Sequence, residues 1–286
     1  MSFYQISDLE QLTGIKAHTI RIWEKRYNLI EPHRSETNIR FYDDQQLIKI
    51  LNVSTLINQG FKISIISKFS LTEIEKKISS ISLNENIATN EIFVNDLTIA
   101  MLEINEINFE KSISNAISKF GVFDAMVTVI YPFLNKVGLL WNINKVMPFQ
   151  EHFASNLIKQ KLHSLIENLP HKKSKFTYLL FLPENEYHEI GLLFSNYILR
   201  AKGIKTVYLG QNIPYQNIET ALQEISPTHI VTMIISNLSI DFFNQKNIFK
   251  LIQSKNIKCL VAGRIDLLTP FEKKYPITIL KSPSSL

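Results

Sequence analysis

The last third of the chain alternates short apolar runs with longer stretches in which apolar residues recur at helical spacing. The short runs are rich in β-branched and aromatic residues, which is typical of buried strands, and they cover residues 176–182, 206–209, 229–235, 258–261 and 277–280. Helices are expected between them over residues 192–202, 218–225 and 242–254. Strands that alternate with helices predict a parallel sheet of the flavodoxin-like, Rossmann-type kind.

The first residues show a different pattern, with two short amphipathic helices joined by a glycine turn. The first helix is expected over residues 6–14, and the second from Lys16 to about Tyr27, which is the order of a helix-turn-helix. On the second helix Ile20, Trp23 and Tyr27 share one face, and this predicts a buried anchor. The basic residues of this helix lie on its other sides and are Lys16, His18, Arg21 and Lys25.

The basic charge near the N-terminus is local. Between Lys16 and Arg40 there are six Lys or Arg against three Glu, whereas the first seventy residues as a whole are nearly balanced. A local basic surface of this kind is expected of a face that docks on nucleic acid. The net charge of +5 agrees with such binding but does not require it.

The middle of the chain is expected to be helical. Apolar residues recur at helical spacing at Ile113, Ile117 and Phe120, and again between Ala154 and Leu165. A short helix and a polar stretch precede this part and are interpreted as a linker. The predicted segments are a helix-turn-helix head (1–72), the linker (73–90), a four-helix bundle (91–170) and the parallel-sheet domain (175–286).

Composition limits the class of protein. A chain of 286 residues with 45% hydrophobic residues can fill the cores of two or three domains. No apolar run is expected to span a membrane and no signal segment begins the chain, so a cytoplasmic location is expected. The chain has a single cysteine, Cys259, which excludes a disulfide framework and a thiolate metal cluster. It falls in a predicted buried strand.

The loop after the first predicted strand carries the strongest candidate for ligand chemistry. His188 lies between strand and helix, with Glu186 two residues before it and Gly191 three residues after it. In open α/β sheets ligands bind outside the carboxyl ends of the strands, where this loop is expected. Glu186 could accept the Nδ1 proton of His188 and leave Nε2 for a metal ion, while Gly191 lets a flat ligand come close.

Two further strand ends carry residues that follow this loop in a recognisable order. Ser236 and Leu238 follow the third strand, and Ala262 with Gly263 end the fourth. The series Glu-x-His-x-x-Gly, Ser-x-Leu and small-Gly resembles the cobalamin-binding domain of methionine synthase and its relatives. The resemblance implies that His188 is the lower ligand of cobalt, and that the displaced nucleotide tail lies beside Ser236, Leu238 and Gly263. Two departures from the family pattern are Glu186 in place of Asp and Ala262 in place of the first glycine. The alternative is a doubly wound domain that binds another nucleotide or nothing, with His188 facing solvent.

A second signal lies upstream of the sheet domain. Trp141 is followed after nine residues by Glu151 and His152, a spacing that resembles the helical cap of the same family. The resemblance implies that these three side chains cover the upper face of the corrin. Light-sensing members place a histidine directly after the tryptophan, where this chain has Asn142. Without the family context, Trp141 would be read as core and the Glu-His pair as a solvated start of a helix.

The N-terminal part resembles the DNA-binding domain of MerR-type transcription regulators. The resemblance covers residues 1 to about 70 and rests on the segments 19–27 and 38–42 together with Pro32. It implies that the second helix enters the major groove and that a wing clamps the phosphates. The residues expected on bases or backbone are Lys16, His18, Thr19, Arg21 and Lys25, and those expected on phosphates are Arg34, Thr37, Arg40 and Tyr42. Otherwise Arg40 and Tyr42 would be surface residues of a small hairpin.

Together the parts resemble the CarH/LitR-type light-responsive repressors. This implies a non-enzymatic regulator that binds double-stranded operator DNA as a homo-oligomer, a dimer or a tetramer, under the control of adenosylcobalamin and light. The resemblance also allows a protein antirepressor as a further partner. One alternative is a MerR-type regulator with a degenerate cobalamin domain that responds to a protein partner. The other is a cobalamin-dependent enzyme, for which the chain has no segment long enough to form a catalytic barrel.

Overall fold

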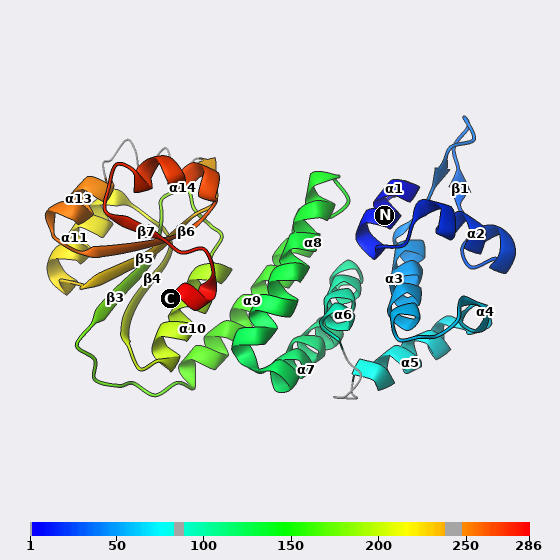
Figure 1. The fold of residues 1–286 in the computed structure, drawn as a ribbon, viewed down its shortest axis with the longest axis horizontal. Coiled ribbons are helices and arrows are strands. Elements are labelled where there is room, and N and C mark those ends of the chain that lie inside the picture. The colour runs from blue at the N-terminus through cyan, green and yellow to red at the C-terminus, as the bar shows by residue number, and fades with distance from the viewer. Residues whose placement is uncertain (1, 83–88, 238–247) are drawn as a thin grey trace. The chain divides into compact units, whose positions relative to one another are not determined.

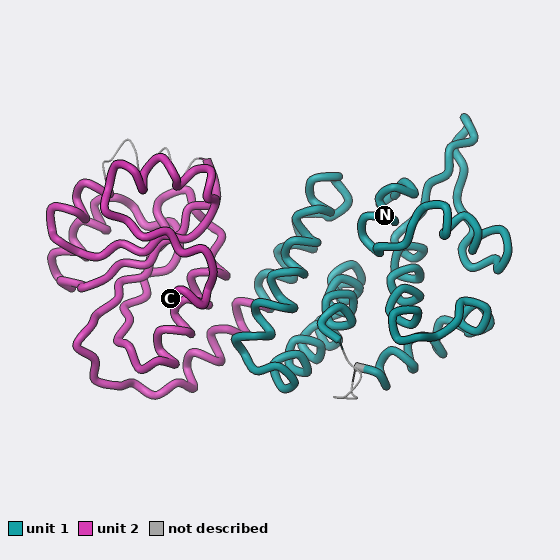
Figure 2. The backbone as a smooth tube through the Cα atoms, viewed as in Figure 1, with its two compact units in different colours: residues 1–157 teal, residues 158–286 magenta. Residues whose placement is uncertain are grey.

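The computed structural model describes residues 2–82, 89–237 and 248–286. The chain forms two compact units, one covering Met1–Leu157 and the other Ile158–Leu286 (Figure 2). Among the described residues, unit 1 is helical apart from one two-stranded hairpin, and unit 2 contains a five-stranded sheet.

Unit 1 begins with the helix-turn-helix that the sequence predicts. Its elements are α1 (Ile6–Thr13), α2 (Ala17–Tyr27), the antiparallel strands β1 (His33–Arg34) and β2 (Arg40–Phe41), α3 (Asp44–Asn58), α4 (Ile63–Ile66) and α5 (Leu71–Ser82) (Figure 1). Gly14 ends α1 with a φ of 73°, a left-handed conformation that glycine adopts without strain. Asp43 caps α3 by accepting a hydrogen bond from the backbone N–H of Gln46.

The core of this head is built from both of its first helices and α3. The predicted anchor holds for Ile20 and Trp23, which are buried, whereas Tyr27 at the end of α2 is only half-buried. Leu9 of α1 and Leu47 of α3 are fully buried as well. Burial of one face fixes α2 and leaves its other sides on the surface.

Helices make up the rest of unit 1, as the sequence predicts. The elements are α6 (Asn90–Leu102), α7 (Glu106–Ala125), the π-helix η1 (Met126–Ile130), α8 (Tyr131–Asn142) and the first half of α9 (Pro148–Glu167). Phe109 at the centre of the bundle meets Phe133 and Phe153 edge to face, at centroid distances of 5.6 and 5.9 Å. The polar stretch expected to be a linker is shorter than expected, since α5 continues to Ser82; residues 83–88 of it lie outside the described part of the chain.

One stretch of the bundle differs from the expectation about membranes. By length and composition alone, Glu106–Asn142 could cross a membrane, so the expectation that no run reaches this length is wrong. The stretch is not one regular helix, because Gly121 has φ 76° and ψ 164° and breaks it. Core helices of soluble proteins pass the same test, and this stretch carries the fully buried Phe109 and Phe133. It is therefore weak evidence for a membrane span.

Unit 2 contains the five-stranded parallel sheet that the alternating pattern predicts. Its elements are β3 (Thr177–Pro183), α10 (Ile190–Ala201), β4 (Lys205–Ile213), α11 (Tyr215–Ile225), β5 (His229–Ile234), α13 (Ile248–Ser254), β6 (Lys258–Gly263), α14 (Ile265–Glu272), β7 (Ile277–Ile279) and a short 3₁₀ turn, η2 (Pro283–Ser285). The sheet order is β4-β3-β5-β6-β7, with every pair parallel. This is the flavodoxin-like order, and the fold class is confirmed.

Both faces of the sheet are covered by helices. On β3, Leu179 and Phe181 join the core beneath α11 and α13, while Leu180 and Leu182 face α10. Residues 242–247, expected to begin the helix that ends at Ser254, lie outside the described part of the chain. Helix α14 was not predicted, because its Pro270 interrupts the helical pattern in sequence.

The sheet order places one loop at a special position. The chain leaves β3 for β4 on one side and later returns to β5 on the other, so β3 is the strand at which the winding direction changes. The loop from β3 to α10, which carries His188, therefore lies at the topological switch point, where open α/β sheets bind their ligands.

Candidate ligand-binding loop and nucleic-acid face

The β3–α10 loop is organised around a buried carboxylate. Glu186 is fully buried, and its Oε1 lies 2.5 Å from Nδ1 of His188. The imidazole itself is 59% exposed. A proton on Nδ1 that is donated to Glu186 leaves the ring lone pair on Nε2, which is a tautomer that metal-ligating histidines adopt. The predicted relation between these two residues is the one that the structure shows.

Glu186 also ties the loop to the neighbouring strand. Its Oε2 accepts hydrogen bonds from the backbone N–H groups of Ile235 (2.8 Å) and Ser236 (2.9 Å), just beyond β5. Its Oε1 accepts further bonds from the backbone of Tyr187 (3.1 Å) and His188 (3.3 Å). A buried carboxylate requires such donors, and here they fix the loop that presents the imidazole.

Two asparagines that the sequence analysis did not single out shape the same loop. Asn185 has a φ of 66°, and its backbone N–H donates to the side-chain oxygen of Asn212 at 2.9 Å. The N–H of Asn212 in turn donates to the carbonyl of Glu186 at 3.2 Å, and the Ser236 hydroxyl donates to the carbonyl of Asn185 at 3.3 Å. Ser236 therefore supports the loop, and its predicted place beside a nucleotide tail stays a prediction. Leu238 lies outside the described residues.

The two predicted glycines serve close approaches within the domain. An added Cβ at Gly191 would lie 2.6 Å from Sδ of Met233, so the glycine lets α10 pack on β5. At Gly263 the φ is 131°, and a Cβ would lie 2.0 Å from the carbonyl oxygen of Ile234 on the adjacent strand. The close approach of the Ile234 carbonyl is by itself a reason for a glycine at position 263. The role of Gly263 in making room for a nucleotide tail stays a prediction.

A second carboxylate beside the loop was missed from sequence. Glu189, directly before α10, accepts a hydrogen bond from the hydroxyl of Tyr208 at 2.9 Å and lies 3.9 Å from Nζ of Lys159. Burial, together with the neighbouring Glu189 carboxylate, raises the pKa of Tyr208 well above its usual range. The sequence alone gives little sign of this cluster, because Lys159, Glu189 and Tyr208 are far apart along the chain.

The residues predicted for a helical cap lie at the end of α8 and the start of α9. Trp141 is 49% exposed, so the alternative that it fills the core is wrong. Near the start of α9, Nδ1 of the exposed His152 lies 3.2 Å from the carboxylate of the half-buried Glu151. Met147 and Phe149 between them are also exposed, which leaves an apolar surface that the sequence analysis did not single out. These residues belong to unit 1 and His188 belongs to unit 2.

The face predicted to meet DNA is exposed on α2 and on the β1–β2 hairpin. The side chains that the structure leaves at this surface are those of Lys16, His18, Arg21, Lys25, Arg34 and Thr37, with Thr19 and Arg40 half-buried. Lys16 forms an ion pair with Glu10 at 3.0 Å, and Arg34 donates to the side-chain oxygen of Asn38 at 2.6 Å. Ile22, which the sequence analysis did not include, is 50% exposed on the same helix.

Tyr42 requires a correction. It was expected to contact phosphate, yet its side chain is fully buried and its hydroxyl donates to Glu24 at 2.5 Å. The same carboxylate lies 3.6 Å from Nε of Arg40. A buried hydroxyl cannot reach a phosphate. The hydrogen bond from Tyr42 instead positions the Glu24 carboxylate of α2 beside the guanidinium of Arg40 in the hairpin.

A buried polar chain links the bundle to the head. Lys136 of α8 donates to the side-chain oxygen of Asn95 on α6 at 2.9 Å, and Asn95 donates to the hydroxyl of Thr55 on α3 at 3.0 Å. Asn95 and Thr55 are 3% and 2% exposed. Because the Asn95 amide and the Thr55 hydroxyl both have hydrogen-bond partners, this contact specifies how α6 lies against α3.

We expect Lys136 to make stability depend on pH. Burial lowers the pKa of Lys136 to about 8, partly opposed by Glu91. In the unfolded chain a lysine titrates near 10.4, so between about pH 8 and 10.4 the unfolded state holds more protons and stability rises with pH. The rise attributable to this group is at most about 3 kcal/mol. Denaturant unfolding at several pH values should show it in the wild type and not in Lys136→Met. The exposed Lys68→Met serves as the control, and an unchanged pH slope in Lys136→Met would contradict the prediction.

Comparison with known proteins assigns the class. Residues 4–72 match the MerR HTH family regulatory protein, and residues 94–166 match the B12 binding domain. The chain thus carries a MerR-type helix-turn-helix domain and a B12-binding domain.

The particular relatives narrow this further. The chain is 25% identical over 244 residues to the HTH-type transcriptional repressor CarH of Myxococcus xanthus, covering 84% of this chain and 81% of that protein. It is 26% identical over 226 residues to the repressor CarA of the same organism, covering 78% and 73%. The chain is homologous to these two proteins. Among solved structures, the monomethylamine corrinoid protein of Methanosarcina barkeri shares the fold, with a TM-score of 0.52 and 16% identity over 69% of this chain and 96% of that one.

Proposed function

We propose that this chain represses transcription by binding operator DNA through its head, and that adenosylcobalamin held at His188 controls the binding, with light as the releasing signal. The observation that carries the proposal is the Glu186–His188 pair at the switch point of the sheet, in a chain whose N-terminal part is a helix-turn-helix. The names of CarH and CarA as transcriptional repressors support the regulatory part, and they support a non-enzymatic role in the cytoplasm.

The residues of unit 2 fit a cobalamin. His188 offers an exposed imidazole whose Nδ1 is held by a buried carboxylate. Its other nitrogen, Nε2, is the kind of donor atom that a cobalt ion binds. Gly191 lets the start of α10 pack closely on Met233 of β5, just after the loop that presents this imidazole. When bound, adenosylcobalamin supplies a cobalt that takes the imidazole nitrogen and a cobalt–carbon bond that light breaks.

The exposed residues at the end of α8 suit the second part of the site. Trp141 presents a flat apolar surface with one N–H donor, and Glu151 and His152 present hydrogen-bonding groups at the start of α9. We propose that these residues cover the upper side of the cofactor. An exposed apolar surface costs free energy in water, so covering it favours the loaded protein.

Regulation would then act through assembly. A single head with a few basic contacts binds DNA weakly, whereas two or four linked heads gain affinity through effective concentration. We propose that the loaded protein is a dimer or a tetramer and that a protein antirepressor acts on the same assembly. His18, Arg21 and Lys25 would meet bases or backbone in the major groove, and Arg34, Thr37 and Arg40 would contact phosphates.

The test compares assembly and operator binding with and without adenosylcobalamin. In darkness we expect the loaded protein to elute as a larger species on size-exclusion chromatography and to bind operator DNA more tightly, by at least about tenfold, than the protein alone. Illumination should reverse both effects. Arg21→Ala should weaken DNA binding by about 1–3 kcal/mol without altering assembly. If the protein retains no cobalamin, the alternative of a degenerate domain that responds to a protein partner replaces the proposal.

A further inference from the structure

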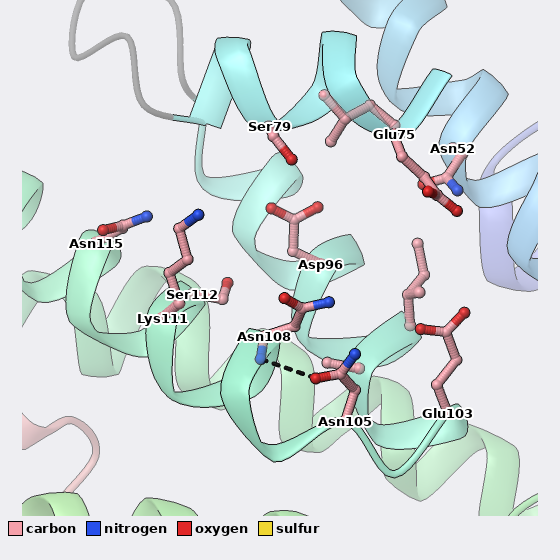
Figure 3. A pocket seen from close by; sticks show the side chains of 13 residues that line it. Asn52, Glu75, Ser79, Asp96, Glu103, Asn105, Asn108, Lys111, Ser112 and Asn115 are labelled. Atoms are coloured by element: carbon pink, nitrogen blue, oxygen red, sulfur yellow. Dashed lines mark hydrogen bonds between the residues drawn. The ribbon is translucent and has the colours of Figure 1, made fainter. Parts of the chain in front are cut away.

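An open, polar cavity lies between the head and the bundle, inside unit 1 and separate from both surfaces described above. Its volume is about 350 Å³, which is within the range of small-molecule sites. Figure 3 shows that its walls come from α3, α5, α6 and α7, with the segment between α6 and α7 closing one end. The site therefore joins the MerR-type domain to the B12-binding domain.

The floor of the cavity holds a hydroxyl that lacks a partner among the described residues. Ser112 of α7 is 5% exposed, and its Oγ has no hydrogen bond there. In Figure 3 this hydroxyl points toward the space between Lys111 and Asp96. Asn52 of α3, 7% exposed, lines the same cavity. A buried polar atom without a partner is uncommon in native proteins and is normally satisfied by water or a ligand.

The charged groups of the cavity favour a cation. Three carboxylates, Glu75, Asp96 and Glu103, line it against one ammonium, that of Lys111. Partial burial raises the pKa of Glu103, and the negative charge of Glu75 adds to the effect. The two carboxylates thus repel each other across the opening, and a bound positive charge would relieve this repulsion.

We propose that this cavity binds a small organic polyamine, whose ammonium groups contact Glu75, Asp96 and Glu103, and that one of these groups also donates a hydrogen bond to the Ser112 hydroxyl. Ammonium groups are donors only, which suits carboxylates, amide oxygens and the Ser112 hydroxyl as acceptors. Since Asn52 belongs to the head and Ser112 to the bundle, such a ligand would stabilise the contact between them. None of the residues that line this cavity belongs to the loop that carries His188.

The test uses spermidine as the probe and isothermal titration calorimetry on the full chain without DNA or cobalamin. We expect saturable binding of one spermidine, weakened about tenfold by Glu103→Gln, which keeps the shape and removes the charge. Glu110→Gln is the matched control, because Glu110 is exposed on α7 outside the cavity, and it should bind within about twofold of the wild type. Spermidine acetylated at its amines should not bind.

Ser112→Ala separates a ligand contact from a structural role. The substitution removes a buried hydroxyl that has no described partner, so the protein without spermidine should unfold at the same or a higher temperature, while spermidine binding weakens severalfold. A loss of thermal stability with unchanged binding would overturn this contact. No saturable binding at millimolar spermidine, equal binding by Glu103→Gln and Glu110→Gln, or equally tight binding of magnesium ions would overturn the proposal.

Discussion

His188→Ala is expected to abolish the histidine-ligated spectrum of protein-bound cobalamin. The wild type, incubated with adenosylcobalamin in darkness and gel-filtered, should elute with a base-off, histidine-ligated absorption spectrum. Without the imidazole no described group in the β3–α10 loop replaces it as a nitrogen donor, so the variant should retain little cobalamin or show an altered spectrum. We expect at least about a tenfold loss of affinity, the size of effect seen even when only the partner of a metal ligand is removed.

The loop geometry supplies a second variant and a control. Glu186→Gln keeps the shape of the side chain but removes the charge that orients His188, and it should weaken retention by about 10- to 100-fold. His171→Ala is the matched control, because His171 precedes β3 and so lies toward the opposite end of that strand from His188. An unchanged wild-type spectrum in His188→Ala would show that the histidine is not the ligand.

Gly263→Ala is expected to destabilise unit 2 by more than about 3 kcal/mol, through a strained φ and a clash with the backbone. The alanine Cβ would lie 2.0 Å from the carbonyl oxygen of Ile234, and neither strand can move freely because β5 and β6 pair over six residues. Denaturant unfolding followed by circular dichroism should show the transition of unit 2 at lower denaturant. Two units can unfold in separate steps, so the transitions are fitted separately.

Gly210→Ala separates the clash from the effect of φ alone. Gly210 lies in β4 with a φ of 86°. The atom nearest to a Cβ added there is a carboxylate oxygen of Glu189, at 3.4 Å. It should therefore show only the cost of the left-handed conformation, about 1–2 kcal/mol. If both variants lose the same stability, the close approach of the two strands at Gly263 is not the cause.

Much of the site was predictable from local spacing. Glu186 and His188 are two residues apart after a strand, so a contact between them depends on few torsion angles, and it is found. The helical periods around Ile20, Trp23 and Ile113 predicted buried faces for the same reason. The misplaced residue, Tyr42, depends on a partner 18 positions away, Glu24, which no local pattern indicates.

The sequence by itself determined most of the elements, α14 excepted, together with their order, the parallel character of the sheet and the kinds of domain present, because these follow from residue periodicity and motifs over short stretches. Only the tertiary structure decided which polar groups meet across long separations. Examples are the bonds from Ile235 and Ser236 to Glu186, and the hydrogen bonds that join Lys136, Asn95 and Thr55. Such contacts depend on how whole helices and strands pack, since burial forces each polar atom to find a partner wherever the fold supplies one.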